Sequence, residues 1–268
     1  MSLFSKRKKL IIGGCSYTDN YAEKQKMPEF PIWGEVLADK LDMDLINLAS
    51  CGYSNKAIYH TLTESMLTNK NVGLVVSMWS EWQRFGAYVD VSTKMLNRHP
   101  WRCFLPERTV KDAEWHDQFY TNGTINPKKQ GLKYDISKAI IAKGLDSIKA
   151  GTVETLGYMY AFQNICEQQD IKYLQVQGCQ PLMGKSEPMQ GIQYRELCNH
   201  IIGSPYTEKM KETFVGWPVD ERIGGFSMDN ILGDEQRFSP EDTHPNEEGH
   251  ELMAERIYRE YEKIYTKV

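Results

Sequence analysis

Short apolar runs and amphipathic stretches alternate along the first third of the chain. Leu10–Gly14, Leu45–Ala49 and Val72–Met78 are short apolar runs bounded by turn residues, which predicts buried strands. Apolar residues at helical spacing predict helices over Trp33–Leu41 and Asn55–Leu67. This alternation predicts a parallel sheet with helices on both faces.

The middle of the chain departs from this pattern. Between Phe85 and Ala150, aromatic, polar and turn residues mix over a stretch longer than an ordinary connection, which predicts an insertion or a lid. Beyond it, the pattern predicts a helix over Val153–Gln168, a strand over Lys172–Val176 and an amphipathic closing helix over Glu247–Tyr265. We therefore expect a single α/β domain, residues 1–268, with an insertion at about residues 85–150.

Charge and hydropathy narrow the kinds of partner that the chain can have. The formal net charge of -4 gives no general attraction to polyanions, and the basic run from Lys6 to Lys9 leads directly into a strand, so we expect no nucleic-acid partner. Apolar runs fall short of the ~20 residues that span a bilayer, and the first is too short for a signal-peptide core. We expect no membrane partner and a cytoplasmic location.

The cysteines and histidines do not form a metal-binding pattern. The six cysteines are scattered without a C-x-x-C pair, which predicts reduced thiols rather than a zinc site or a disulfide framework. The histidines lack ligand spacing with one another or with the cysteines. We expect no metal and no cofactor.

Polar loops follow the first three predicted strands, and a fourth precedes the closing helix. They span Gly14–Asp19, Ser50–Asn55, Trp79–Arg84 and Asp242–Asn246. Open α/β sheets bind ligands outside the carboxyl ends of their strands, so the first three loops should converge there. Proline after His244 directs the chain in the fourth loop, so the histidine can be presented to the same crevice.

These loops carry a nucleophile, a base and a carboxylate. A serine hydroxyl attacks well only when a histidine accepts its proton and a carboxylate orients that histidine. Ser16, His244 and Asp242 can fill these roles. Cys15 is a rival nucleophile, but successive side chains after a strand alternate in direction, so we expect Cys15 to be packed.

Three sequence blocks resemble those of the SGNH (GDSL-type) hydrolases. They are GCS at Gly14–Ser16, NLASCGYSN at Asn47–Asn55 and DTHPNEEGH at Asp242–His250. The order and spacing also agree with the family. The likeness is nearest to SGNH-like proteins encoded by bacteriophages, which would permit association with a virion.

The resemblance implies a fold and a set of roles. The fold is flavodoxin-like, with three α/β/α layers around a parallel sheet. By position in the blocks, Ser16 is the nucleophile, Gly52 is the oxyanion-hole glycine, and His244 works with the acidic Asp242.

Two departures from the family leave alternatives open. The family has four blocks, and its third, at Trp79–Trp82 in this chain, lacks the asparagine that supplies an oxyanion donor. Asn55 or the Ser80 hydroxyl must therefore substitute, or the site binds without catalysing. As the first residue of a predicted helix, Asn55 also suits an N-cap. In the last block Glu241 occupies the family's place for the acid; we favour Asp242 because its short side chain suits a tight turn.

Together these residues predict a metal-independent serine esterase. Backbone N–H groups of Ser16 and Gly52 would hold the oxyanion, with Asn55 as a third donor. The resemblance favours a short acyl group, such as acetyl on a carbohydrate, and leaves the oligomeric state open. Ser80 and Arg84 are candidate substrate contacts, although Arg84 equally suits an ion pair with Glu81.

Two other functions compete with this one. A non-catalytic binding module on the same fold would explain the missing third-block asparagine. A phosphate- or nucleotide-binding flavodoxin-like protein would use the first loop as an anion cradle. The chain lacks the G-x-G-x-x-G and G-x-x-x-x-G-K-[ST] patterns that would favour this last function.

Overall fold

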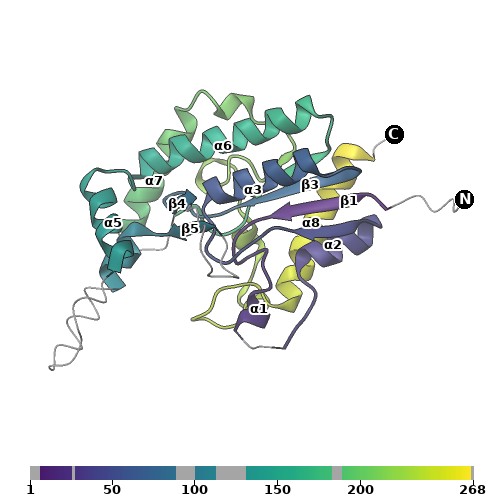
Figure 1. Ribbon diagram of the computed structural model, residues 1–268, viewed down its shortest axis with the longest axis horizontal. Helices are drawn as coiled ribbons and strands as arrows, with labels where there is room; N and C mark the ends of the chain where they lie inside the picture. Colours follow the sequence, from purple (N-terminus) through teal and green to yellow (C-terminus); the bar gives the residue numbers. More distant parts are fainter. Residues whose placement is uncertain (1–6, 26–27, 89–99, 113–130, 183–188, 267–268) are drawn as a thin grey trace, which may run out of the picture.

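A parallel sheet forms the centre of the protein, in a computed structural model that describes residues 7–25, 28–88, 100–112, 131–182 and 189–266 (Figure 1). Within these residues the sheet has five strands: β1 (Lys9–Gly13), β2 (Asp44–Asn47), β3 (Val72–Trp79), β6 (Tyr173–Gln177) and β7 (Phe214–Val215). The spatial order is β2-β1-β3-β6-β7, with every pairing parallel. Counted along the chain this is 2-1-3-4-5, the flavodoxin-like order, so the predicted sheet is confirmed.

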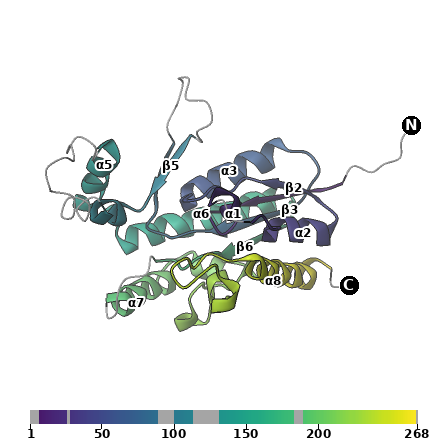
Figure 2. The same cartoon turned by 90° about the horizontal axis from the view of Figure 1, so that it is seen from below.

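Helices cover both faces of this sheet (Figures 1 and 2). One layer contains α2 (Trp33–Leu41) and α8 (Glu247–Tyr265). The opposite layer contains α3 (Asn55–Thr68) and α6 (Ile148–Gln168), with α7 (Met189–Ile202) against α6. The three-layer α/β/α architecture predicted from the sequence is therefore confirmed.

Two hydrophobic clusters hold the layers together, one on each face of the sheet. Ile11 packs with the α3 and α6 side, whereas its neighbours Leu10 and Ile12 pack with the α2 and α8 side. All three side chains are fully buried. Successive side chains of a strand point to opposite faces, so a strand covered on both sides must be apolar at every position.

The segment predicted as an insertion contains regular structure that the sequence pattern did not reveal. Strands β4 (Phe85–Tyr88) and β5 (Trp101–Phe104) pair antiparallel, and α5 (Gly131–Ala142) follows. In Figure 1 these elements lie beyond the carboxyl ends of the parallel strands. The sequence analysis also missed α1 (Tyr21–Lys24), α7 and β7. Among the described residues before α8 it missed the 3-10 helices η2 (Thr207–Lys209), η3 (Glu221–Ile223), η4 (Met228–Ile231) and η5 (Asp234–Gln236).

Capping explains two differences at helix starts. The hydroxyl of Ser147 accepts the Ala150 N–H at 3.2 Å, so α6 begins earlier than the predicted Val153. The N-cap of α3 is Ser54, whose hydroxyl accepts the Ala57 N–H at 3.3 Å. The expectation that Asn55 caps this helix is therefore wrong.

Other features of the chain bear on partners and redox state. No helix within the described residues is long and apolar enough to cross a membrane. All six cysteines lie in the described part of the chain and are free thiols. Of the basic run, Lys6 lies outside the described residues, whereas Lys9 begins β1 and donates to the Asn69 side chain at 2.6 Å.

Candidate active site

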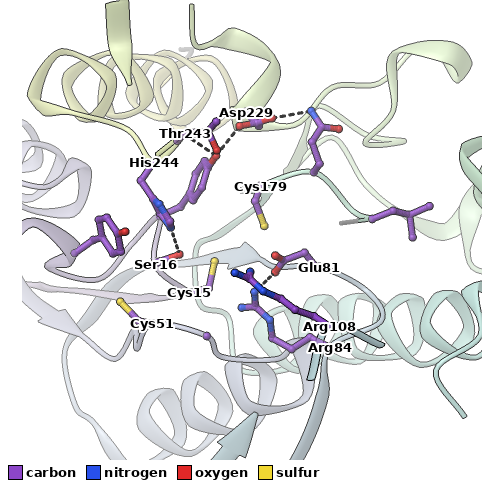
Figure 3. Close-up of a pocket in the computed structure, with 15 residues that line it drawn as sticks. Cys15, Ser16, Cys51, Glu81, Arg84, Arg108, Cys179, Asp229, Thr243 and His244 are labelled. Atoms are coloured by element: carbon purple, nitrogen blue, oxygen red, sulfur yellow. Dashed lines mark hydrogen bonds and ion pairs between the residues drawn. The ribbon is translucent and has the colours of Figure 1, made fainter. Parts of the chain in front are cut away.

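A serine, a histidine and an aspartate form a hydrogen-bonded chain at the carboxyl end of the sheet, and Figure 3 draws the serine and the histidine of this chain. Ser16 lies on the loop after β1, and His244 lies just before α8. His244 Nε2 is 2.8 Å from Ser16 Oγ, and its Nδ1 is 2.6 Å from Asp242 Oδ1. The structure thus brings together the three residues to which the sequence assigned the triad roles.

The carboxylate beside His244 belongs to Asp242, not to Glu241. Asp242 Oδ1 also accepts the backbone N–H of His244 at 3.2 Å, whereas the exposed Glu241 accepts from Ser239 at 3.0 Å. Burial alone would raise the pKa of Asp242, but its hydrogen bonds, chiefly to His244 and Tyr21, outweigh burial and lower it. Asp242 is therefore ionised at neutral pH and can stabilise a positively charged imidazole.

Tyr21 supports the histidine and the aspartate at once, a role that the sequence analysis missed. Its hydroxyl donates to Asp242 Oδ2 at 2.9 Å. Its ring stacks on the His244 imidazole, with centroids 3.9 Å apart and an interplanar angle of 16°. Tyr21 is the first residue of α1 and lies close to Ser16 in the chain. Nothing in the sequence indicates that its ring packs against His244, which is more than two hundred residues away.

A second network ties the serine loop to the histidine loop. Tyr17, next to Ser16, donates its hydroxyl to Asp229 Oδ1 at 2.6 Å. Arg237 donates to the same carboxylate at 2.8 Å and to the backbone carbonyl of Thr243 at 2.7 Å. Burial, followed by the Asp229 charge, raises the pKa of Tyr17, so its hydroxyl remains a donor. Because Thr243 directly precedes His244, this network limits movement of His244 relative to Ser16.

Backbone N–H groups beside Ser16 suit an oxyanion hole. Gly52 lines the pocket with φ 82°, a conformation that favours glycine, and a Cβ built there would meet nothing within 4 Å. Within the described residues, the N–H groups of Ser16 and Gly52 have no hydrogen-bond acceptor. The Cys51 N–H donates to Asp19 Oδ2 at 2.7 Å, which holds the second loop against the first. Both free donors are thus carried on fixed loops.

Asn55 does not reach the pocket. Its Oδ1 accepts the Ser80 N–H at 2.7 Å, and its amide donates to the Ser80 carbonyl at 3.2 Å and to the Thr155 hydroxyl at 3.1 Å. The side chain is buried, with 3% of its surface exposed. The expectation that this amide supplies a third oxyanion donor is therefore corrected: it fixes the backbone of the third loop.

The third loop brings an ion pair, rather than the Ser80 hydroxyl, to the pocket. Ser80 is fully buried, does not line the pocket, and donates its hydroxyl to Glu81 Oε2 at 2.8 Å. Glu81 and Arg84 line the pocket and pair with each other, and Arg84 also donates to the Tyr53 carbonyl at 3.0 Å. Burial alone would raise the pKa of Glu81, but the Arg84 charge and the Ser80 hydroxyl lower it. Of the two candidate substrate contacts, Arg84 therefore faces the pocket and Ser80 does not.

Cys15 is buried, with 1% of its surface exposed, as the sequence predicted. Its thiol forms a hydrogen bond with Cys179, which lowers the pKa of Cys15 and raises that of Cys179. Both residues line the pocket (Figure 3). The imidazole of His244 nevertheless bonds to Ser16 Oγ, so the geometry pairs the base with the serine.

A cavity of about 500 Å³, open to solvent, is lined by Ser16, Gly52 and His244 together with the Glu81–Arg84 pair. The insertion also contributes to its lining, through Arg108 on a helical segment over residues 106–112. The sequence analysis missed this contribution, because nothing in the local pattern shows which way the segment folds. Within the described residues, no group of three or more histidine, cysteine, aspartate or glutamate side chains could hold a metal ion.

Comparison with known proteins finds likeness at the level of structure. Neither a protein-family model nor a curated protein matches the sequence. The matched structures include G-D-S-L family proteins and esterases. A lipolytic protein of the G-D-S-L family from Desulfitobacterium hafniense DCB-2 is 14% identical, covers 94% of this chain and 99% of its own, and has a TM-score of 0.46.

Two esterases give similar values. The psychrotrophic esterase EstA from Pseudoalteromonas sp. is 12% identical over 97% of this chain and 100% of its own, with a TM-score of 0.45. Axe2, an acetylxylan esterase from Geobacillus stearothermophilus, is 13% identical over 97% of this chain and 96% of its own, with a TM-score of 0.44. The likeness to bacteriophage proteins that the sequence suggests stays a prediction.

Proposed function

We propose that the protein is a serine esterase of the SGNH type. The observation that carries this proposal is the pair of contacts at 2.8 Å and 2.6 Å that joins Ser16, His244 and Asp242 into one relay. Histidine held between a hydroxyl and a carboxylate is the arrangement that turns serine into a nucleophile. The relay opens onto a cavity, so a substrate can reach it.

The reaction proceeds by acyl transfer. Ser16 Oγ attacks the ester carbonyl carbon while His244 Nε2 takes the hydroxyl proton, and Asp242 stabilises the imidazolium that results. The tetrahedral intermediate collapses as its bond to the alcohol oxygen breaks, and His244 returns the proton to that oxygen. Water then attacks the acyl-enzyme, gives a proton to His244 and releases the carboxylic acid, and the proton returns to Ser16.

Two backbone N–H groups stabilise the oxyanion. The N–H groups of Ser16 and Gly52 have no competing acceptor in the described part of the chain, which supports this role. The side chains of Asn55 and Ser80 are bonded elsewhere. Loss of one oxyanion donor lowers kcat by about a hundredfold to a thousandfold, so we expect turnover slower than that of an enzyme with three donors.

The substrate is a small-molecule or carbohydrate ester with a short acyl group, such as acetyl. The SGNH-like blocks favour this class, and the cavity of about 500 Å³ suits a ligand of modest size. No step of the reaction needs a cofactor. A panel of acyl esters tests the range of acyl groups that the cavity takes.

A fluorophosphonate probe tests the proposal, because it reacts with a serine that a neighbouring histidine activates. We expect one adduct on Ser16, none in Ser16→Ala, and an unchanged adduct in Cys15→Ala. An adduct on another residue would assign the nucleophile elsewhere.

The absence of the third-block asparagine favours one alternative, a non-catalytic binding module on the same fold. Such a module would give no adduct and no ester hydrolysis while its Ser16→Ala variant still bound ligand.

A further inference from the structure

The arginines around the cavity differ in their partners. Glu81 and Arg84 pair with each other, and Asp229 pairs with Arg237 at 2.8 Å, so each pair sums to zero. Arg108 also lines the cavity. Its ion-pair partner Asp112 lies outside the lining, so within the described residues no carboxylate of the cavity pairs with Arg108.

The ion pair that Arg108 does make leaves its terminal nitrogens free. Its Nε lies 3.7 Å from Asp112 Oδ2, four residues later, and both side chains are 65% exposed. Exposed pairs of this kind contribute little, because water and salt screen them. Within the described residues, the two terminal nitrogens of Arg108 have no acceptor, so its guanidinium can bind a planar anion such as a carboxylate.

The position of this cation relative to the relay indicates which part of an ester it meets. His244 must protonate the departing alcohol, so the alcohol lies on the His244 side of Ser16. The oxyanion lies toward the Gly52 N–H. The rest of the acyl group extends in the remaining direction, and Figure 3 shows Arg108 across the pocket from His244.

We infer that the preferred substrate carries a carboxylate on its acyl group and that Arg108 binds this carboxylate. The preferred substrate is then a half-ester of a dicarboxylic acid rather than the acetyl ester given above as an example, and the insertion supplies the residue that selects it. This inference rests on the proposed esterase function. It makes Arg108 a specificity-determining residue, whereas Arg84 is held by Glu81 and shapes the wall of the cavity.

The test compares two para-nitrophenyl esters that differ in one group. One is the half-ester of adipic acid, and the other is its analogue in which a methyl ketone replaces the carboxylate. We expect the half-ester to have a KM about tenfold below that of the ketone, because two parallel hydrogen bonds from the guanidinium to a carboxylate are stronger than its single contact with Asp112. High salt should raise the KM of the half-ester selectively.

Two variants locate the effect. In Arg108→Gln the ratio of the two KM values should fall to about one. Arg195→Gln removes the same charge from an exposed position on α7 outside the cavity lining, and should keep the tenfold ratio. Equal KM values in the wild type, or a ratio that survives Arg108→Gln, would overturn the inference.

Other outcomes separate this inference from the esterase proposal. Preference for para-acetoxybenzoate, whose carboxylate lies on the alcohol side, over uncharged phenyl acetate would overturn the assignment to the acyl group. If no ester is hydrolysed, the esterase proposal fails, and calorimetric binding of adipate still tests Arg108. Binding that is lost in Arg108→Gln and kept in Arg195→Gln supports the anion site, and equal binding by both variants overturns it.

Discussion

Replacing Asp242 with asparagine isolates the contribution of one negative charge to the relay. Two N–H donors of His244, its backbone N–H and Nδ1–H, converge on Asp242 Oδ1. An asparagine would therefore keep its carbonyl at that position. Its amide would face the Tyr21 hydroxyl, which can rotate to accept. We expect the imidazole to keep its tautomer and the enzyme to lose only the carboxylate charge.

The magnitude follows from the distance and the exposure of the pair. Opposite charges about 4 Å apart attract by about 1 kcal/mol in water and by about 4 kcal/mol at an effective dielectric constant of 20. The His244 and Asp242 side chains are 27% and 32% exposed, so an intermediate value of about 2 to 3 kcal/mol applies. This corresponds to a fall in kcat of about a hundredfold. KM should change little, because the imidazolium forms only on the way to the transition state.

Steady-state hydrolysis of para-nitrophenyl acetate by wild type, Asp242→Asn and Glu241→Gln measures the effect. Glu241→Gln is the matched control, because it removes the same charge one residue away and should change kcat by less than about threefold. A loss in Asp242→Asn as small as that of the control would refute the role of Asp242. A loss of about ten-thousandfold would show instead that the tautomer changes.

Three further predictions follow from other contacts. Asn55→Ala should lower the free energy of unfolding by roughly 1 to 3 kcal/mol, because it leaves the buried Ser80 N–H without an acceptor. The same variant should change kcat by less than about threefold. Thermal denaturation and ester hydrolysis measure the two effects, and a fall in kcat at unchanged stability would contradict the prediction. Tyr21→Phe keeps the stacked ring but loses the hydrogen bond to Asp242, so kcat should fall by about threefold to tenfold, and an unchanged kcat would show that the hydroxyl is dispensable.

The third prediction concerns the buried His250. Burial, followed by the charge of His244, lowers the pKa of His250 to about 4. Its Nδ1 accepts the Trp33 N–H at 3.2 Å. In the unfolded chain His250 binds a proton near pH 6.5, whereas in the folded chain it does so only near pH 4. The free energy of unfolding should therefore fall by about 3 kcal/mol as the pH drops from 6.5 to 4. Urea unfolding from pH 4 to 7 measures the free energy of unfolding, which should depend less on pH in His250→Gln than in the wild type. Equal slopes in the two proteins would contradict the role of His250.

The layers of the fold and part of the candidate site could be predicted from the sequence because both leave local signals. Buried parallel strands must be apolar throughout, as in β1 and β3, and amphipathic helices such as α2 and α8 show their spacing directly. Polar loops directly after such strands must meet at one edge of the sheet. Ser16 and Gly52 could therefore be placed at a common site, whereas His244 precedes a helix and was assigned to the same crevice by the proline that follows it and by the resemblance of its block to the SGNH hydrolases.

The tertiary structure alone decided the partners of each side chain. Asp242 and Glu241 are adjacent, and only the turn against Ser16 determines which carboxylate faces His244. The role of Asn55 depends on the Ser80 backbone, which lies on another loop. Tyr21 and Arg108 reach the site from a short helix and from the insertion, through contacts between segments far apart in the chain. Local patterns record burial and backbone preference, whereas these pairings arise from long-range packing, which leaves no periodic signal in the sequence.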